Sequence, residues 1–252
     1  MIKATNISKN FGSIKILKNI DIEINTSEIT VIIGPSGSGK TTLLNCLSML
    51  NTPDKGLIQI DGTRYNFPNA HAKIRKQFKY KGSQQVGIVF QNINLIPNWT
   101  NEENITKPLL KTNLFDKSEL NNLIDIFKVK SILHKLPHQC SRGEQQRIAF
   151  IRAVMLHPKY LYLDEVTSAL DPELISILFN YLIYLKSKGT GIIVVTHFLL
   201  FAQNLADKIV FINQGEILEQ GTKDIMINPK TSQFKKFLMS LENVIITNNN
   251  IE

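Results

Sequence analysis

The first 33 residues alternate between apolar and polar side chains, which is the pattern of half-buried strands. Ile20, Ile22 and Ile24 mark the apolar face of this segment. The residues at 29–33 form a short apolar run rich in β-branched side chains, which predicts a fully buried strand. Beyond a glycine-rich stretch, leucines recur at helical spacing across 41–50. The pattern therefore predicts strands, then a glycine-rich turn, then a helix.

The middle of the chain changes from short strands to helices. Apolar runs at 57–60 and 86–90 predict strands. Between them lies a polar insertion at 64–85, for which we expect a loop with a short helix. The next segment has a helical pattern, in which Ser118 is expected to cap one helix and a second helix is expected over 141–156.

The remaining part of the chain alternates between strands and helices. Strands are predicted at 160–163, 191–195 and 208–212, and helices at 173–188 and 199–206. This βαβ alternation predicts an α/β fold with a largely parallel sheet and helices on its faces. Because the chain has no internal repeat, we expect a single domain over 1–240, followed by a flexible, asparagine-rich tail at 241–252.

Composition and charge exclude several classes of protein. Of the 252 residues, 43% are hydrophobic and 20% are charged, which is typical of a globular protein rather than a disordered one. No apolar run approaches the ~18 residues of a membrane span, and no secretory signal is visible. The net charge of +8 is not gathered into one stripe with aromatic residues, so we expect no nucleic-acid partner. Cys46 and Cys140 lack metal-ligand spacing and are expected to be thiols in a reducing compartment.

The glycine-rich stretch after the strand at 29–33 has the spacing G-x-x-x-x-G-K-[ST]. Glycines let the backbone approach phosphates closely, and the following helix presents its N–H groups to them. Lys40 is expected to act on the β- and γ-phosphates of ATP, and the Thr41 hydroxyl to bind Mg²⁺. The expected nucleotide-binding residues are Gly34, Pro35, Ser36, Gly37, Ser38, Gly39, Lys40, Thr41 and Thr42. A glycine-rich turn that binds nothing is the alternative.

Two acidic residues, Asp164 and Glu165, directly follow the apolar run at 160–163. This position is the carboxyl edge of a parallel strand, where α/β sheets bind ligands. Asp164 is expected to hold Mg²⁺ directly or through water. Glu165 is expected to orient and deprotonate a water for in-line attack on the γ-phosphate. Alone, such a pair is more typical of a surface turn, but the glycine-rich loop favours the functional interpretation.

Several further stretches, together with the two above, resemble the ordered motifs of ABC ATPases. They are an A-loop at 9–12, a Q-loop at 89–91, a signature at 140–147, a Walker B and D-loop stretch at 163–172, and an H-loop at 194–197. The resemblance spans residues 1 to about 240. It implies a P-loop NTPase (RecA-like) core with a mostly parallel sheet, an N-terminal antiparallel β subdomain and an inserted α-helical subdomain. The core and β subdomain would comprise 1–91 and 157–240, and the helical signature subdomain 92–156.

The resemblance also implies roles for single residues in ATP hydrolysis. Phe11 would stack on adenine. Gln91 would reach the Mg²⁺ or the attacking water, with a catalytic role. His197 would contact the γ-phosphate and stabilise the geometry around Glu165.

In ABC ATPases the signature of one chain closes on the ATP that a second chain holds, so the resemblance implies a dimer with two nucleotides between the chains. Ser141 and Gly143 would contact the γ-phosphate of the partner's ATP. The residues agree, because Ser141 and Glu144 have the spacing of a capping box, which predicts a helix start with free N–H groups.

The signature departs from the family at Arg142, which replaces the first glycine of the usual pair, and at Cys140, which replaces leucine. Val166 replaces the proline after the acidic pair. If position 142 needs a positive φ, the arginine costs about 1 kcal/mol. Alternatively its side chain points outward or adds positive charge near the γ-phosphate. We expect a working but slowed enzyme, with an inactive one as the alternative.

The stretches at 87–97, 219–221 and 228–238 resemble ATPases of bacterial uptake systems for polar amino acids of the glutamine, histidine or arginine type. This implies a peripheral subunit on the cytoplasmic face of the inner membrane. Its partners would be permease subunits, an identical or paired ATPase subunit and, indirectly, a solute-binding protein. Alternatives are an ATPase of lipoprotein release, export or cell division, a translation or DNA-repair ATPase, and a structural subunit that does not hydrolyse ATP.

Overall fold

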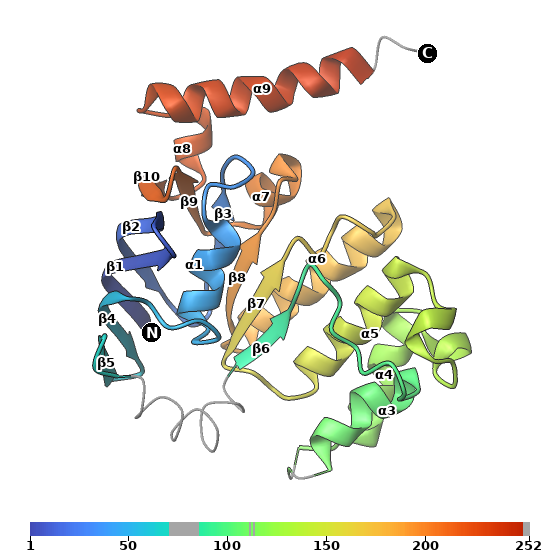
Figure 1. Cartoon of the computed structure of the whole chain (residues 1–252). Helices are drawn as coiled ribbons and strands as arrows, with labels where there is room; N and C mark the ends of the chain where they lie inside the picture. Colours follow the sequence, from blue (N-terminus) through green and yellow to red (C-terminus); the bar gives the residue numbers. More distant parts are fainter. Residues whose placement is uncertain (71–85, 111, 113, 249–252) are drawn as a thin grey trace.

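A computed structural model of the chain describes residues 1–70, 86–110, 112 and 114–248 (Figure 1). The strands are β1 (Ile2–Phe11), β2 (Ile14–Ile24), β3 (Ile29–Ile33), β4 (Lys55–Ile60), β5 (Thr63–Phe67), β6 (Val86–Val89), β7 (Tyr160–Asp164), β8 (Gly191–Val195), β9 (Lys208–Asn213) and β10 (Glu216–Gly221). The α-helices are α1 (Lys40–Leu47), α3 (Asn101–Thr106), α4 (Lys117–Ile126), α5 (Arg142–Val154), α6 (Pro172–Ser187), α7 (Leu199–Leu205), α8 (Asp224–Ile227) and α9 (Ser232–Asn248). Three 3₁₀ turns, η2 (Lys107–Leu109), η3 (Lys130–Ile132) and η4 (Pro137–Gln139), connect helices between β6 and β7.

The strands form two sheets. The smaller sheet is antiparallel, with the order β2-β1-β4-β5. The larger has six strands in the order β10-β9-β3-β8-β7-β6, and all are parallel to their neighbours except β10 at one edge. The predicted α/β fold with a mostly parallel sheet and an N-terminal antiparallel sheet is therefore confirmed.

Both faces of the larger sheet are buried. Along β7, Leu161 and Leu163 belong to one hydrophobic cluster, whereas Tyr160 and Tyr162 belong to another. The first cluster includes side chains of α5, α6 and α7, and the second includes α1 and the antiparallel sheet. Helix α1 therefore lies between the two sheets, as Figure 1 shows. Because alternate residues of a strand point to opposite faces, burial on both sides requires the continuous apolar runs seen in the sequence.

The helices α3, α4 and α5 form the predicted insertion between β6 and β7 (Figure 1). Helix α5 packs on α3 and on β6, which joins the insertion to the parallel sheet. Among the described residues, none of the helices combines the length and the apolar character needed to cross a bilayer.

The structure corrects several details of the prediction. The first part of the expected loop at 64–85 is a strand, β5, in which Tyr65 and Phe67 are buried while Arg64 and Asn66 are exposed. Residues 71–85 of this expected loop lie outside the described residues, so the short helix expected within it is not tested. Helix α4 begins one residue before Ser118, because Asp116 is its cap and accepts hydrogen bonds from the N–H groups of Ser118 at 2.7 Å and Glu119 at 3.3 Å.

The C-terminal part contains elements that the hydrophobic pattern did not predict. Strand β10 pairs with β9 at the edge of the larger sheet, and α8 and α9 follow it. Helix α9 begins at Ser232 and continues to Asn248, into the segment at 241–252 for which we expect a flexible tail. Its Phe234 is fully buried and stacks on Phe211 of β9 at 4.4 Å between ring centroids, which anchors the start of the helix to the sheet.

Candidate active site

The carboxyl ends of β3, β7 and β8 meet at one edge of the larger sheet, and the loops after them carry most of the predicted site residues. Parallel strands place the loops that follow them at the same edge, which is where α/β sheets bind ligands. A pocket of about 420 Å³ opens there. It is lined by Ile16, Ser36, Gly37, Gly39, Lys40, Thr41, Thr42, Gln91, Glu165 and His197.

Two glycines of the glycine-rich loop leave no room for a side chain. A Cβ atom on Gly34 would lie 2.0 Å from the backbone oxygen of Ile212. Gly39 has a φ of 105°, and a Cβ atom there would lie 3.0 Å from a methyl carbon of Leu17. Since Gly39 is the N-cap of α1 and has no side chain, no side-chain hydrogen bond caps this helix. The first N–H groups of α1 are therefore available to an anion.

Lys40, the first residue of α1, is buried and lies against the glycine-rich loop. Its Nζ donates hydrogen bonds to the backbone oxygens of Gly34 at 2.8 Å and Pro35 at 2.7 Å. Burial lowers the pKa of Lys40, and the carboxylates of Glu165 and Asp164 oppose this effect by raising it. A buried ammonium group bonded to carbonyls gains from a negatively charged partner, so a phosphate suits this position.

Asp164 ends β7 and is almost fully buried beside Thr41. The Thr41 hydroxyl donates a hydrogen bond to Asp164 Oδ1 at 3.3 Å. Burial raises the pKa of Asp164; the Thr41 hydrogen bond lowers it, Glu165 raises it further, and Lys40 and His197 lower it.

A carboxylate and a hydroxyl side by side are the hard oxygen ligands that Mg²⁺ prefers, so Asp164 and Thr41 fit this ion. Across the described ranges, no cluster of three or more His, Cys, Asp or Glu side chains has the arrangement of a metal site.

Glu165 is held between Gln91 and His197. Its Oε1 lies 2.6 Å from His197 Nε2, and its Oε2 accepts a hydrogen bond from Gln91 Nε2 at 2.8 Å. The backbone of Glu165 has a positive φ of 52°, and its N–H donates to the backbone oxygen of Val195 at 2.9 Å. A left-handed conformation in a residue other than glycine is costly and is often found at functional sites. The sharp turn after β7 directs the carboxylate into the pocket.

The structure brings most of the predicted residues together but not all of them. Gly34, Pro35 and Asp164 do not line the pocket but bond to residues that do. Ser38 does not line the pocket either, and its buried hydroxyl has no hydrogen-bond partner among the described residues. Phe11, the predicted adenine contact, is 51% exposed and lies outside the pocket lining, where Ile16 of β2 is found instead. Ile16 was not predicted, because its only signal was its place in an alternating strand.

The signature residues Ser141 and Gly143 also lie outside the pocket of their own chain. Ser141 caps α5, and the predicted capping box with Glu144 is confirmed in both directions, at 3.2 Å and 2.7 Å. A Cβ atom on Gly143 would lie 2.5 Å from the backbone oxygen of Ala169, in the loop after β7. Glycine at this position therefore allows the start of α5 to approach that loop.

Arg142 is the first residue of α5 and is not among the residues with a positive φ. The strain considered for this position is therefore absent. Its Nη2 donates a hydrogen bond to the backbone oxygen of Gln91 at 3.2 Å, within the same chain.

The other two departures from the family motifs, at Cys140 in the signature and Val166 after the acidic pair, are also accommodated in the structure. Cys140 Sγ accepts a hydrogen bond from the Asn101 amide at 3.2 Å, and Val166 is buried. Both cysteines have free thiols, as expected from their spacing.

Comparisons with known proteins agree with this geometry. The family model described as ABC transporter matches residues 17–168. A probable amino-acid import ATP-binding protein of Bacillus subtilis, YxeO, is 39% identical over 94% of this chain and 96% of its own length. The glutamine transport ATP-binding protein GlnQ of Escherichia coli is 37% identical over 94% of this chain and 98% of its own length.

A solved structure leads to the same result. The dimeric structure of MJ0796, described as a bacterial ABC transporter cassette, superposes with a TM-score of 0.76 at 29% identity, covering 88% of this chain and 99% of that one. A second structure of that cassette contains ADP and phosphate. The predicted P-loop NTPase fold and the predicted family are therefore both confirmed. The chain belongs to the ABC transporter family and is one of its ATP-binding subunits, an ATPase.

Proposed function

We propose that this chain hydrolyses ATP with Glu165 as the general base. The observation that carries the proposal is the contact of the Glu165 carboxylate with His197 at 2.6 Å and with Gln91 at 2.8 Å, at the edge of a phosphate-binding loop. Glu165 orients a water for in-line attack on the γ-phosphate and accepts its proton. His197 and Gln91 hold the carboxylate in position, and His197 is close enough to the pocket to contact the γ-phosphate.

The glycine-rich loop and α1 bind the triphosphate. The N–H groups of residues 36–42 surround the phosphates, and Lys40 exchanges its two carbonyl partners for oxygens of the β- and γ-phosphates. Thr41 and Asp164 hold Mg²⁺, with Gln91 as a further ligand. The ion, when bound, neutralises charge on the phosphates. Phe11, exposed at the end of β1, stacks on the adenine.

Two chains form the complete site. Ser141 and Gly143 lie outside the pocket of their own chain and at a capped helix start. We assign them to the γ-phosphate of ATP bound by a second, identical or paired, ATPase subunit. The dimeric structure of the related cassette supports this arrangement.

The chain energises amino-acid import as a peripheral subunit on the cytoplasmic face of the membrane. The support is the names of its relatives, which include import or transport ATP-binding proteins for glutamine, arginine, cystine and glutamate. Its partners are permease subunits and, through them, a solute-binding protein. A role in lipoprotein release, export or cell division has no such support among these relatives.

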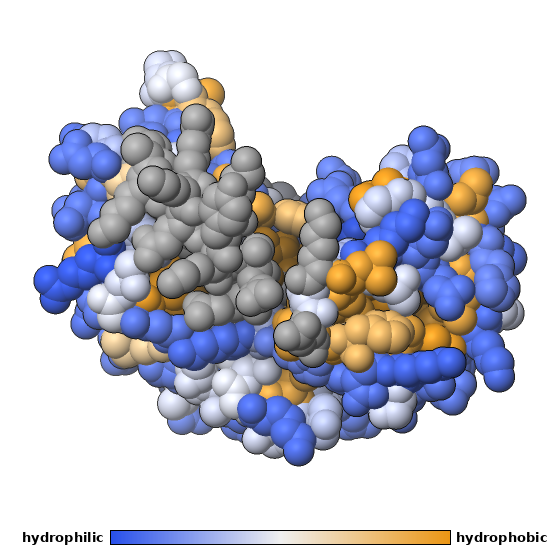
Figure 2. Space-filling model, turned by 90° about the horizontal axis from the view of Figure 1, so that it is seen from below, coloured by the Kyte–Doolittle hydropathy of each residue, from blue (hydrophilic) through white to orange (hydrophobic). Residues whose placement is uncertain are grey.

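Figure 2 shows the face of the molecule seen from below in Figure 1. Apolar patches lie among polar surface on this face (Figure 2). Ile96 and Leu110, which flank α3 in the helical insertion, are 40% and 77% exposed. Apolar side chains that gather in a surface patch are typical of protein contacts, so these two residues are candidate contacts for the permease.

Single-site variants test the hydrolytic site. Glu165→Gln is expected to keep ATP affinity but to lower kcat by about 10²- to 10⁴-fold, because the amide cannot accept the proton of water. Lys40→Ala is expected to lose ATP affinity. The control is Lys235→Ala, which removes an exposed lysine of α9. Steady-state hydrolysis and equilibrium nucleotide binding measure both effects, and unchanged kcat in Glu165→Gln would overturn the assignment of the base.

Transport requires its own experiment. The chain is purified with its permease, placed in proteoliposomes and tested for ATP-dependent uptake of labelled glutamine, arginine, glutamate and cystine. Uptake of at least one of these by the wild type, and loss of uptake with Glu165→Gln, is the expected result. Hydrolysis without uptake of any amino acid would reject the proposed cargo class and leave the ATPase assignment intact.

A further inference from the structure

Gln91 joins the helical insertion to the site of hydrolysis. It follows β6, and its side-chain Nε2 donates a hydrogen bond to Glu165 Oε2 at 2.8 Å. Its backbone oxygen accepts a hydrogen bond from Arg142 Nη2 at 3.2 Å, at the start of α5. Arg142, Gln91, Glu165 and His197 are therefore linked in one continuous series of contacts within a single chain.

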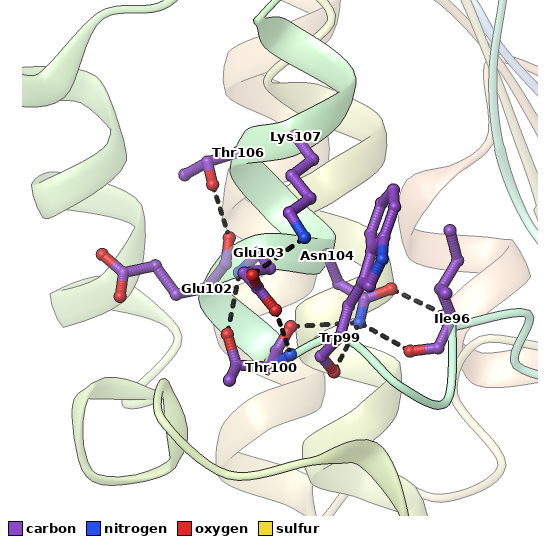
Figure 3. Close-up of polar contacts among 8 residues, drawn as sticks. All are labelled: Ile96, Trp99, Thr100, Glu102, Glu103, Asn104, Thr106 and Lys107. Carbon is purple, nitrogen blue, oxygen red and sulfur yellow. Dashed lines mark hydrogen bonds and ion pairs between the residues drawn. The ribbon is translucent and has the colours of Figure 1, made fainter.

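The segment after Gln91 is held by other side chains of the insertion. Arg152 of α5 donates a hydrogen bond to the backbone oxygen of Asn94 at 2.9 Å. Figure 3 shows Asn104 of α3 bonded to the next part of the segment: it accepts from the N–H of Ile96 at 2.7 Å and donates to the Ile96 oxygen at 3.1 Å. Both anchors lie beyond Gln91 along the chain. Among the described residues, the side-chain hydrogen bond from α5 to the backbone of Gln91 itself is the one from Arg142.

Arg142 makes this contact without backbone strain. It is the first residue of α5, its side chain is exposed, and its φ is not positive. The glycine that the family signature has at this position has no side chain to donate such a hydrogen bond. The contact thus depends on a residue in which this chain departs from the signature it resembles.

We infer that Arg142 is a positioning residue for ATP hydrolysis, acting through Gln91. Its guanidinium holds the Gln91 backbone so that the side-chain amide stays on the Glu165 carboxylate. The inference rests on the proposed role of Glu165 as the base. It reverses the expectation that the arginine slows the enzyme, because removal of the side chain is expected to lower turnover.

A double-mutant cycle on the full chain, in the dimer or with its permease, separates this role from direct contact with the partner's ATP. Arg142→Ala is expected to lower kcat about three- to tenfold and to change the KM and Kd for ATP by less than about twofold. In a Gln91→Ala background the same change is expected to have no further effect, since no side-chain amide is left to position. An equal loss in both backgrounds, or a weaker Kd for ATP, would overturn the inference in favour of a phosphate contact.

Two other variants of Arg142 extend the kinetic test. Arg142→Lys keeps a charged donor on a long side chain and is expected to recover at least half of wild-type kcat, whereas Arg142→Gly is expected to match Arg142→Ala. Arg64→Ala, at an exposed position of β5, is the control and should equal the wild type.

Hydrogen exchange reports on the contact even in the absence of turnover. In the nucleotide-free chain, backbone amides of 90–95 should exchange about three- to tenfold faster in Arg142→Ala than in Arg64→Ala. Equal exchange would reject the contact. A wild type that exchanges as expected but never hydrolyses ATP would instead reject the proposed function.

Discussion

The Nε2 atom of His197 lies 2.6 Å from Oε1 of Glu165, although helix α6 and strand β8 separate the two residues along the chain. The contact follows from the sheet, because Asp164 and Val195 are paired neighbours on β7 and β8 and each site residue lies just beyond them. The N–H of Glu165 also donates to the backbone oxygen of Val195 at 2.9 Å. The relative position of the two side chains is therefore determined by parallel pairing of the strands.

Replacing His197 by alanine is expected to lower kcat by about 100-fold, since Glu165 would lose the partner that holds one of its oxygens. The affinity for ATP should change little, because Lys40 and the glycine-rich loop bind the phosphates. Steady-state kinetics and nucleotide binding give the two values. The control is His134→Ala, whose side chain is 90% exposed. Turnover within about twofold of the wild type would show that Glu165 is positioned without the imidazole.

The nucleotide-free protein is expected to become more stable when Asp164 is replaced by asparagine. Burial raises the pKa of Asp164, so the folded state binds its proton more tightly than the unfolded state does. The stability contributed by this group is present below the unfolded pKa of about 3.8 and is lost as the pH rises through the folded value.

Thermal unfolding of Asp164→Asn at several pH values tests this prediction. The variant should have a higher Tm than the wild type at pH 7, and the difference should decrease as the pH falls toward 4. Asp125→Asn, an exposed change on α4, is the control. A lower Tm for Asp164→Asn at pH 7 would mean that its contacts with Thr41 and Lys40 outweigh the cost of burial.

Much of the fold could be predicted because its central strands are apolar on both faces. Strands β3, β7 and β8 are buried on both faces. Each therefore appears in the sequence as a continuous apolar run, which predicts a strand without information about its neighbours. Edge elements carry a weaker signal. In β5 only Tyr65 and Phe67 are buried, so the strand was hidden within a polar stretch, and β10 has a single buried residue, Glu219. The Asp116 cap was missed because Ser118 stood closer to the apolar residues of α4.

Most residues of the site could be predicted from the sequence, but not all of the contacts between them. The glycine-rich loop at 34–42 directly follows the predicted strand at 29–33, and the acidic pair directly follows the predicted strand at 160–163. Their proximity therefore follows from the order of these strands in the sheet. The hydrogen bond from Arg142 to the Gln91 oxygen has no such signal. A backbone carbonyl accepts from any donor within reach, and only the packing of α5 on β6 brings this guanidinium to it.

Asp61 is expected to stabilise the folded chain at neutral pH by about 1 kcal/mol, because solvent screens its contacts at this exposed position. Burial raises its pKa, but hydrogen bonds from Lys159, the N-terminal ammonium and Tyr160 outweigh this and lower it from 3.8 to about 2. A lowered carboxyl pKa stabilises the fold above the unfolded value, and the effect is lost as the pH falls through the folded one. Urea unfolding should show Asp61→Asn less stable than the wild type at pH 7, with most of this deficit lost at about pH 2. A deficit that persists at pH 2 would point to lost packing instead of lost charge.

The amide of Asn104 is expected to be the most sensitive position of the helical insertion for stability. It is fully buried, accepts from the Ile96 N–H at 2.7 Å, and donates to the backbone oxygens of Ile96, Trp99 and Thr100 at 3.1 to 3.2 Å (Figure 3). Asn104→Ala removes all of these side-chain hydrogen bonds. The Ile96 and Thr100 oxygens keep the backbone N–H groups of Trp99 and Asn104, but the Ile96 N–H and the Trp99 oxygen lose their amide partner, which costs about 2 kcal/mol.

Urea unfolding of the nucleotide-free chain measures this cost, with Asn121→Ala on the exposed side of α4 as the matched control. The control should change the free energy of unfolding by less than about 0.5 kcal/mol. Asn104→Asp keeps the acceptor for Ile96 but loses the donors, so its loss should be at least as large as that of alanine, because a buried carboxylate would face three carbonyl oxygens. If the aspartate variant were instead as stable as the wild type, the segment at 96–100 would be held by its apolar contacts and not by the Asn104 amide.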